Sequence, residues 1–528
     1  MFVPLTPVRF LHRAMDVFGD KVGVICGDKQ FTFAEFGERC ERLAAALPAH
    51  GIAAGDRVAY LSLNTHKLLE GYFGPPQAGA VLMPLNVRLS PPELIEILNH
   101  SGAKMLIFES DFAPLIPKLR ESCPEIARYV GADDAPAADL TYDELIASGT
   151  PRRADIFSID ENSIAELFYT SGSTGSPKGV ALSHRTLYLH GMSIAMLMRA
   201  PEIAVDLATI PMFHANGWGH AHACAMLGVP QVMVRRFDPR QVLAMIERYH
   251  ATSMAVVPTM ANALLNVPDA SSFALDSVLD IQVGGAAASP ELIERMEKLF
   301  PNAQCTAGYG LTETSPVLCY ARPKKPVPRN DPHRWRRQAM TGWPVPGVEL
   351  RVVDVAMQDV PRDGKTIGEI IATGDHIMDG YFRDPAGTKA AMTGPWLHTG
   401  DMAVWDEEGW VTIVDRSKEI IISGGENISS LEIEKAIYAH PAVFECAAVS
   451  APDEKWGEVP VAVVVLKEGH RLSEQELMDF LGARLGRYKL PRRVEFRAEP
   501  LPKTGTGKVR KMVLREKYWQ GHARRVHG

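Results

Sequence analysis

A run of small polar residues followed by a lysine is the stretch of this sequence best suited to chemistry. It covers residues 170–178 (Thr-Ser-Gly-Ser-Thr-Gly-Ser-Pro-Lys) and follows an apolar run at 164–169 that predicts a β-strand. Glycines allow backbone N–H groups to turn toward one point, hydroxyl groups add further donors, and Lys178 adds a positive charge. These groups suit a polyphosphate, or the charge that develops on a phosphoryl group during transfer. By composition alone, a flexible Ser/Gly loop explains the run about equally well.

The spacing excludes a Walker A loop. That pattern requires G-x-x-x-x-G-K-[ST], and it occurs nowhere in the chain. The nearest match, Gly-Thr-Gly-Lys at 505–508, has Pro502 in place of the first glycine and Val509 in place of the Ser or Thr. It remains a second glycine-rich loop that carries a lysine, Lys508.

Small and polar residues also follow two predicted strands in the middle of the chain. The strand at 280–283 ends in Gly-Gly-Ala-Ala-Ala, where a flat ligand can lie against the backbone, although tight strand–helix packing is an equally compatible explanation. The strand at 304–306 leads into Gly-Tyr-Gly-Leu-Thr-Glu, which is not G-x-G-x-x-G and therefore not a dinucleotide loop. Tyr309 can present its ring face to a base, while Thr312 and Glu313 offer oxygen atoms that suit phosphate and Mg²⁺.

A further carboxylate follows in His-Thr-Gly-Asp at 398–401, which we expect to form a turn between short strands. Asp401 can there accept two hydroxyl hydrogen bonds, as from a ribose. An ordinary Asp turn has the same composition.

The bulk composition is ordinary for a soluble globular protein and does not favour a nucleic-acid binder. The 528 residues contain 56 Lys and Arg against 63 Asp and Glu, a net charge of −7, so no general attraction to nucleic acid is expected. The seven cysteines are scattered without a C-x-x-C pair, which favours reduced thiols and a cytoplasmic location. No run of about 18 apolar residues occurs, so we expect no membrane span.

The pattern of predicted elements changes twice along the chain. Short apolar strands first alternate with helices of about ten residues, a pattern that favours parallel α/β layers. These helices include one expected over 67–78 and one expected to begin at the Ser-Pro pair 289–290, with Ser as N-cap and Pro in the first turn. From Gly342 onward, short strands between Gly, Asp and Pro turns indicate a β-rich subdomain, and the last 110 or so residues form a compact α+β unit. We therefore expect an α/β fold, with a large N-terminal domain of layered α/β subdomains plus the β-rich subdomain at 1–417, and a small α+β C-terminal domain at 418–528.

The loop at 169–180, together with the order of the other motifs, resembles the adenylate-forming superfamily of acyl-CoA synthetases, luciferases and peptide-synthetase adenylation domains. The resemblance covers nearly the whole chain and at least five motifs in the family's order. It implies an ATP site, a Mg²⁺ ion, and a mobile C-terminal domain that rotates about a hinge at Lys418. Two half-reactions would then use one site in turn.

The resemblance also implies individual roles. ATP phosphates would be held by Thr170, Ser171, Gly172, Ser173, Thr174, Gly175 and Lys178. The adenine slot would be formed by Gly284, Gly285, Ala286, Ala287 and Tyr309. Phosphate would contact Thr312, Mg²⁺ would bind Glu313 and Thr170, and the ribose would bind Asp401 with Arg416 nearby. Lys508 would bridge the attacking carboxylate and the α-phosphate, and Gly425 would line the path of the CoA pantetheine arm. The catalytic set would comprise Lys508, Thr170, Glu313 and His214.

The residues expected around the acid are His214, Trp218 and Gly310. Amino-acid-activating relatives place Asp after the Phe of the corresponding motif, whereas this chain has His214, and a buried ammonium without a counter-charge is costly. Trp218 and the small residues after it resemble the fatty-acyl and methylthiopropionate-CoA ligase branch. We therefore expect an ATP-dependent ligase that converts a fatty, alicyclic or similar monocarboxylic acid to acyl-AMP and then to acyl-CoA, releasing AMP and pyrophosphate.

Several alternatives stay open at this point. The acid can be an aryl acid, or the acyl-AMP can feed a carrier protein or an oxidising luciferase reaction instead of CoA, although no fused carrier segment is evident. A catalytically inactive nucleotide sensor is disfavoured because Lys508 and Glu313 are both present. The expected partners are a small carboxylic acid, ATP and CoA, with no nucleic acid and no membrane span. A homodimer, the chain length of the acid and peripheral membrane association are left open.

Overall fold

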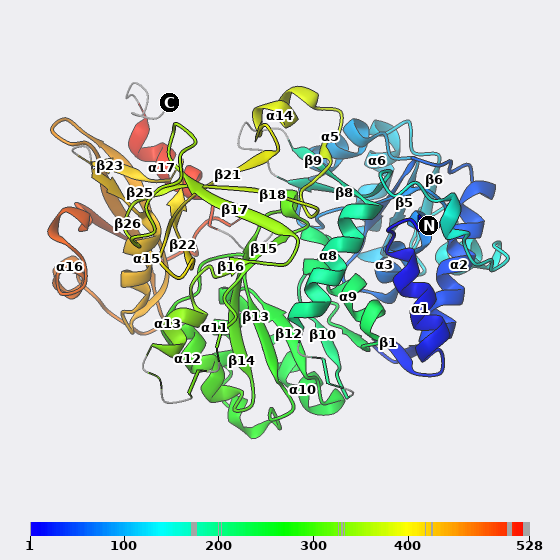
Figure 1. The fold of residues 1–528 in the computed structure, drawn as a ribbon, viewed down its shortest axis with the longest axis horizontal. Helices are drawn as coiled ribbons and strands as arrows, with labels where there is room; N and C mark the ends of the chain where they lie inside the picture. The colour runs from blue at the N-terminus through cyan, green and yellow to red at the C-terminus, as the bar shows by residue number, and fades with distance from the viewer. Residues whose placement is uncertain are drawn as a thin grey trace.

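The computed structural model describes residues 2–170, 177–198, 200–201, 203–325, 327–328, 331, 333–417, 419–423, 426–503 and 509–520. Figure 1 shows two sheet-and-helix layers beside each other and a β-rich part (yellow-green) above the green layer. A separate C-terminal unit (orange and red) lies at the end of the molecule opposite α1 (Val8–Phe18) and α2 (Phe33–Ala49). The expected α/β architecture, with a large N-terminal and a small C-terminal domain, is confirmed.

An eight-stranded sheet carries the predicted phosphate loop. Its strand order is β19-β9-β8-β4-β3-β5-β6-β7. The strands are β3 (Arg57–Leu61), β4 (Val81–Pro84), β5 (Met105–Phe108), β6 (Arg128–Gly131), β7 (Leu140–Thr141), β8 (Ile164–Thr170), β9 (Lys178–Ser183) and β19 (Gly380–Tyr381). The strands β3 to β8 pair in parallel, whereas β8 and β9 form an antiparallel pair around the loop. The strand predicted before the loop is therefore confirmed.

A nine-stranded sheet carries the predicted adenine and acyl segments. Its order is β16-β15-β14-β13-β12-β10-β11-β1-β2. The strands are β1 (Val22–Cys26), β2 (Lys29–Thr32), β10 (Asp206–Ala208), β11 (Gln231–Met233), β12 (Ser253–Val256), β13 (Asp280–Val283), β14 (Gln304–Gly310), β15 (Val317–Tyr320) and β16 (Trp343–Pro344). The strands β10 to β14 are parallel, so their carboxyl ends, where ligands bind in open α/β sheets, meet along one edge.

Helices cover these two sheets. They are α1 (Val8–Phe18), α2 (Phe33–Ala49), α3 (His66–Gly71), α4 (Gly74–Gln77), α5 (Pro91–Ser101), α6 (Ile116–Ser122), α7 (Tyr142–Ala147), α8 (His184–Leu197), α9 (His220–Leu227), α10 (Pro239–Tyr249), α11 (Pro258–Leu265), α12 (Pro290–Leu299), α13 (Arg334–Gln338) and α14 (Pro385–Ala390). Local sequence explains many starts: the Ser289 side chain accepts the Leu292 N–H, and Pro290 follows in the first turn, as predicted. The single helix predicted over 67–78 is wrong. The structure has α3 and α4 instead, because Pro75 and Pro76 fit the first turn of a new helix but not the interior of a longer one.

The β-rich part contains β17 (Val348–Val353), β18 (Gly368–Gly374), β20 (Met392–Thr393), β21 (Trp396–Trp405) and β22 (Val411–Arg416). The turn predicted at 398–401 is wrong, because these residues lie inside the ten-residue strand β21. Gly400 has a φ of +72°, and the register with β22 shifts next to it, between Met402 and Ala403. A glycine of this conformation bends the strand locally without ending it.

The C-terminal unit is a five-stranded sheet with three helices. Its elements are β23 (Ile421–Ser423), β24 (Glu426–Ile428), β25 (Val443–Asp453), β26 (Gly457–Leu466), β27 (Arg493–Arg497), α15 (Ser430–Tyr438), α16 (Glu474–Gly482) and α17 (Lys511–Trp519). Hydrogen bonds join it to the end of β22, because the Ser430 N–H donates to Asp415 Oδ2 at 2.5 Å. Lys511 Nζ lies 2.8 Å from Glu434 and 3.3 Å from Glu419, which ties the start of α17 to the same junction.

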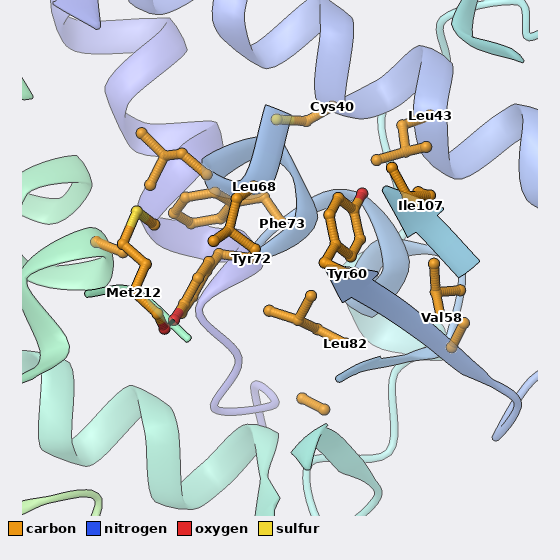
Figure 2. Packing of buried hydrophobic residues seen from close by; sticks show 14 of the residues in the cluster. Cys40, Leu43, Val58, Tyr60, Leu68, Tyr72, Phe73, Leu82, Ile107 and Met212 are labelled. Carbon is orange, nitrogen blue, oxygen red and sulfur yellow. Dashed lines mark hydrogen bonds between the residues drawn. The ribbon is translucent and has the colours of Figure 1, made fainter. Parts of the chain in front are cut away.

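The core of the first layer packs α3 against the strands of the eight-stranded sheet. Figure 2 shows Tyr60 and Leu82 from the strands and Tyr72 and Phe73 from the segment that ends α3, all of them fully or nearly fully buried. Met212 lies beside Tyr72 in the same view, so this core reaches the segment predicted to hold the acid. Among the described residues, no helix is both long and apolar enough to cross a membrane.

Candidate active site

The predicted phosphate loop joins two paired strands. Thr170 is the last residue of β8, Lys178 is the first residue of β9, and the two are partners in the antiparallel ladder. Both side chains are half-buried. The predicted phosphate ligands Ser171, Gly172, Ser173, Thr174 and Gly175 lie outside the described residues. Because the ladder closes at Thr170 and Lys178, the motif connects two antiparallel strands, whereas a Walker A motif connects a strand to a helix.

Tyr381, which no sequence motif marks, contacts both Glu313 and Lys178. Glu313 lies in a short 3₁₀ turn, η5 (Thr312–Thr314), directly after β14. The Tyr381 hydroxyl donates a hydrogen bond to Glu313 Oε1 at 2.9 Å, and Lys178 Nζ lies 4.5 Å from the centre of the Tyr381 ring. An open hollow of about 520 Å³ lies beside this cluster, lined between residues 379 and 392. The expected metal carboxylate and the expected phosphate lysine are thus brought together.

The Asp401 carboxylate is buried and has polar partners among the described residues of the site. It is only 4% exposed, and it accepts a hydrogen bond of 2.6 Å from the Tyr309 hydroxyl at Oδ2. Arg416 Nε lies 3.2 Å from its Oδ1, as β22 pairs with β21. Burial opposes the charge of Arg416, yet nearby carboxylates, including Asp401 and Glu313, raise the pKa of the guanidinium on balance. Burial and Asp401 raise the pKa of the Tyr309 phenol, so it stays a donor.

The residues of the predicted adenine slot differ in exposure to solvent. Gly284 is buried at the end of β13, whereas Gly285, Ala286 and Ala287 are exposed. Gly285 has a φ of +75°, a conformation that only glycine adopts readily. A side chain on Gly284 would place its Cβ 2.9 Å from the Trp218 ring and 3.2 Å from the Gly308 carbonyl oxygen. Trp218, which is predicted to line the acid pocket, therefore lies directly beside Gly284 of the predicted adenine slot.

The acyl segment has an unusual backbone. The turn η3 (Ala215–Gly219) contains five consecutive residues of positive φ, among them Asn216 at +42° and Trp218 at +59°. Left-handed conformations are costly for residues with a side chain, by about 1–3 kcal/mol each, and they cluster at functional sites. His214 precedes the turn in extended conformation and is half-buried, while Trp218 is 9% exposed.

Two residues that sequence reasoning missed hold this segment in place. The Asn64 side chain donates to the carbonyls of Ala208 and Ile210 at 3.0 and 2.8 Å and accepts the Met212 N–H at 2.8 Å. The Tyr72 hydroxyl donates to the Met212 carbonyl at 2.5 Å. No periodicity or motif marks Asn64 or Tyr72, because their partners lie about 140 residues further along the chain.

Gly310 and Thr312 have local structural reasons for their residue types. A Cβ on Gly310 would lie 1.6 Å from the Pro316 carbonyl oxygen, so this position requires glycine whatever its part in the acid pocket. Thr312 is 8% exposed at the start of η5. Its role toward phosphate stays a prediction.

Three predicted residues, Gly425, Lys418 and Lys508, lie outside the described residues. The residues on either side of the Lys508 loop are nevertheless well held. Lys503 and Val509 form an antiparallel bridge, and the Arg510 N–H donates to the Pro502 carbonyl at 2.7 Å. The described residues on the two sides of this loop are therefore neighbours in space.

Comparison with known proteins agrees with this geometry. The model of the AMP-binding enzyme family matches residues 11–382, and the model of the AMP-binding enzyme C-terminal domain matches residues 432–508. A long-chain-fatty-acid–CoA ligase of Thermus thermophilus is 39% identical over 96% of this chain and 95% of that protein. A 4-hydroxybutyrate–CoA ligase of Metallosphaera sedula is 34% identical over 97% of this chain and 94% of that protein.

Solved structures agree as well. An anthranilate–CoA ligase in complex with anthranoyl-AMP superimposes with a TM-score of 0.88 at 26% identity, covering 98% of both chains. ATP and CoA are substrates of this family. The chain therefore belongs to the AMP-binding enzyme family of adenylate-forming proteins, and within it to the ATP-dependent acid–CoA ligases.

Proposed function

We propose that this ligase activates an aliphatic or alicyclic monocarboxylate, with Asp401, Glu313 and Lys508 as its principal polar groups. The observation that carries the assignment of the ATP site is the buried Asp401 carboxylate, which is held by Tyr309 and Arg416, while Arg416 is also stabilised by the charge of Glu313. Two kinds of carboxylate suit a magnesium nucleotide, one that accepts hydrogen bonds from ribose hydroxyls and one that binds a divalent cation. The arrangement supports an ATP site with its ribose at Asp401 and its triphosphate near Glu313 and Lys178.

The donor set at Glu313 fits Mg²⁺. Carboxylate and hydroxyl oxygens are the ligands this hard cation prefers, and Glu313 and Thr170 supply them beside the Lys178 cation. When bound there, Mg²⁺ would supply positive charge that offsets the charge of the triphosphate. Glu313 Oε1 is engaged by Tyr381, while Oε2 has no hydrogen-bond partner among the described residues, which leaves that oxygen for a cation.

Positively charged side chains of the protein then promote the first half-reaction. A carboxylate is a poor nucleophile toward ATP because both are negatively charged, and Lys508 would lower that repulsion at the reacting oxygen and the α-phosphate. An oxygen of the acid forms a bond to the α-phosphorus, and pyrophosphate leaves. In the second half-reaction the CoA thiolate attacks the acyl carbon, and AMP leaves.

An acid panel tests this function. AMP release with CoA is measured for acids from propionate to palmitate, and for cyclohexanecarboxylate and benzoate. We expect the highest kcat/KM among the aliphatic or alicyclic acids. A preference for benzoate would overturn the substrate class in favour of aryl acids, which the named substrate of the anthranilate relative makes the natural alternative. AMP release that needs no CoA but does need a carrier protein would overturn the choice of acceptor.

Trp218→Ala is expected to change the chain-length preference of this panel. Removing the indole that packs on Gly284 opens space beside Ile210 and Ala255, which belong to the same apolar cluster. Each methylene that gains a contact is worth about 1–3 kcal/mol, so longer acids should gain roughly tenfold or more in kcat/KM relative to short ones. Trp396→Ala, in the β-rich part, is the matched control. An unchanged profile in Trp218→Ala would remove Trp218 from the acid pocket.

We also propose that the chain alternates between two arrangements of residues 1–417 and 418–528, with Lys418 as the hinge. The orientation described here is held by hydrogen bonds that cross this boundary, from Ser430 to Asp415 and from Ser429 to the Val414 carbonyl. When the C-terminal domain rotates about a short hinge, hydrogen bonds between the domains break and others form, while the core of each domain stays the same.

Lys418→Pro is expected to leave one half-reaction active and to block the other. Proline fixes φ near −65° and removes the N–H group, so the backbone rotation at the hinge becomes restricted. Overall acyl-CoA formation should fall about a hundredfold, as for other losses of catalytic positioning, while either acyl-AMP formation or CoA attack on supplied acyl-AMP stays near the wild-type rate. Lys418→Ala removes the charge without fixing φ and is the matched control. Normal overall turnover in Lys418→Pro would place the hinge elsewhere.

A cytoplasmic location is part of this proposal. All seven cysteines are free thiols, which suits a reducing compartment.

Light scattering on the purified protein distinguishes a homodimer from a monomer.

A further inference from the structure

Tyr381 lies next to the phosphate loop because of a two-residue strand. The strand β19 pairs antiparallel with β9, with Tyr381 opposite Val180 and Gly380 opposite Ala181. The Tyr381 N–H donates to the Thr388 hydroxyl at 2.8 Å, which anchors the strand to α14. The side chain is therefore placed by backbone contacts on both of its sides.

The tyrosine contacts the two groups that would meet the metal–triphosphate part of ATP. Its hydroxyl donates to Glu313 Oε1 at 2.9 Å, and Lys178 Nζ lies 4.5 Å from its ring centre. A second hydrogen bond ties Glu313 to the same segment, because the Met378 N–H donates to the Glu313 carbonyl at 2.9 Å.

This environment is not that of a core tyrosine. Tyr381 is half-buried and lines the open hollow of about 520 Å³, whose lining also includes Arg383 and Lys389. The hydroxyl engages one carboxylate oxygen of Glu313 and so orients the other. The face of the Tyr381 ring attracts the Lys178 ammonium from one side. The other N–H groups of Lys178 are then available to bind an anion.

We propose that Tyr381 is a positioning residue for the triphosphate end of ATP, whose hydroxyl orients Glu313 for a divalent cation and whose ring holds Lys178 for phosphate. The two functions belong to different atoms of one side chain and are therefore separable by substitution. The proposal rests on the assignment of Glu313 to Mg²⁺ and of Lys178 to phosphate in the proposed function.

Calorimetric titration of the full-length protein with ATP, without acid or CoA, tests the proposal. Each titration is run in EDTA and across a series of Mg²⁺ concentrations. Tyr381→Phe keeps the ring and loses the hydroxyl, and Tyr381→Leu loses both. Tyr518→Phe is the matched control, because Tyr518 also donates to a carboxylate, Glu495 at 2.6 Å, and also lies under a lysine, Lys517 at 4.7 Å, but in the C-terminal unit. Thermal unfolding checks that each variant is folded.

The expected results differ between the two variants. Tyr381→Phe should raise the Mg²⁺ concentration for half-maximal ATP binding about tenfold, as for loss of a hydrogen bond to a charged group, with ATP affinity in EDTA within twofold of wild type. Tyr381→Leu should show that same effect and also a two- to fivefold loss of ATP affinity in EDTA, roughly the value of a cation–π contact at a partly exposed site. Tyr518→Phe should bind as wild type does.

Three outcomes would overturn the proposal, and they are distinguishable. If Glu313→Gln abolishes the Mg²⁺-dependent gain in ATP binding while Tyr381→Phe titrates as wild type does, the positioning role is wrong and the metal assignment stands. If Glu313→Gln leaves the Mg²⁺ dependence unchanged, the metal assignment itself is wrong, and the role of Tyr381 falls with it. Equal loss of affinity in EDTA and in Mg²⁺ for Tyr381→Phe would assign the hydroxyl to general structure and would also reject the proposal.

Discussion

Lys508→Ala is expected to lower the rate of acyl-AMP formation about a hundred- to a thousandfold, the usual effect of removing one preorganised donor to a transition-state charge. Attack of CoA on supplied acyl-AMP should stay within threefold of wild type, because that half-reaction has no carboxylate–phosphate repulsion to overcome. The C-terminal unit anchors the loop of Lys508 at both ends, through the bridge between Lys503 and Val509. Pyrophosphate release measures the first half-reaction, and thioester formation from synthetic acyl-AMP measures the second.

Lys503→Ala is the matched control for this prediction. It removes a lysine at the start of the same loop, but one whose ammonium is paired with Glu445 inside the C-terminal unit. We expect both half-reactions of Lys503→Ala to change by similar small factors. Equal and large losses in the two half-reactions of Lys508→Ala would reject the role of Lys508 in adenylation.

Asp401→Asn is expected to weaken ATP binding about ten- to a hundredfold, because hydrogen bonds to a charged group are worth about 1.5–3 kcal/mol. The variant keeps the shape of the side chain and the Tyr309 contact but loses the charge opposite Arg416 and the preference for ribose hydroxyls. The effect should depend on the sugar. Wild type should prefer ATP to 2′-deoxy-ATP and 3′-deoxy-ATP, and this preference should shrink in Asp401→Asn.

Asp359→Asn is the control for the loss of an Asp–Arg pair. Asp359 pairs with Arg351 Nε at 2.6 Å in the same β-rich part, but both side chains are substantially exposed. We expect ATP affinity and sugar preference to be unchanged there, since exposed pairs contribute little. If Asp401→Asn weakens ATP and its deoxy analogues by the same factor, Asp401 does not contact the ribose.

Much of the fold was predictable because it depends on neighbours in the sequence. The apolar run before the phosphate loop forms β8, and the Ser-Pro pair at 289–290 begins α12 as expected. The errors came from glycine and proline, whose effect depends on context. Prolines divided the helix predicted over 67–78, and Gly400 bent a strand where a turn was predicted.

The chemistry of the site was determined by the sequence alone as far as residue type and order. A Ser/Thr/Gly run ending in Lys178, a Thr-Glu pair after a strand, and the isolated Asp401 and Lys508 can all be found in the order of the amino acids. Their motif order was sufficient to indicate an adenylate-forming enzyme. A residue type is a property of the chain itself, so it can be recognised without knowing where the residue lies in space.

Only the tertiary structure decided how these groups meet. Tyr309 and Asp401 form a hydrogen bond although they are 92 residues apart in the sequence, and Tyr381 and Glu313 do so although they are 68 residues apart. The Tyr309 contact brings together β14 and β21, which belong to different sheets, and the Tyr381 contact depends on the pairing of β19 with the distant strand β9. No local periodicity encodes either arrangement. The contacts of Tyr381 with Glu313 and Lys178 could not be predicted for this reason. No motif surrounds Tyr381 in the sequence, and strand pairing brings its partners to it.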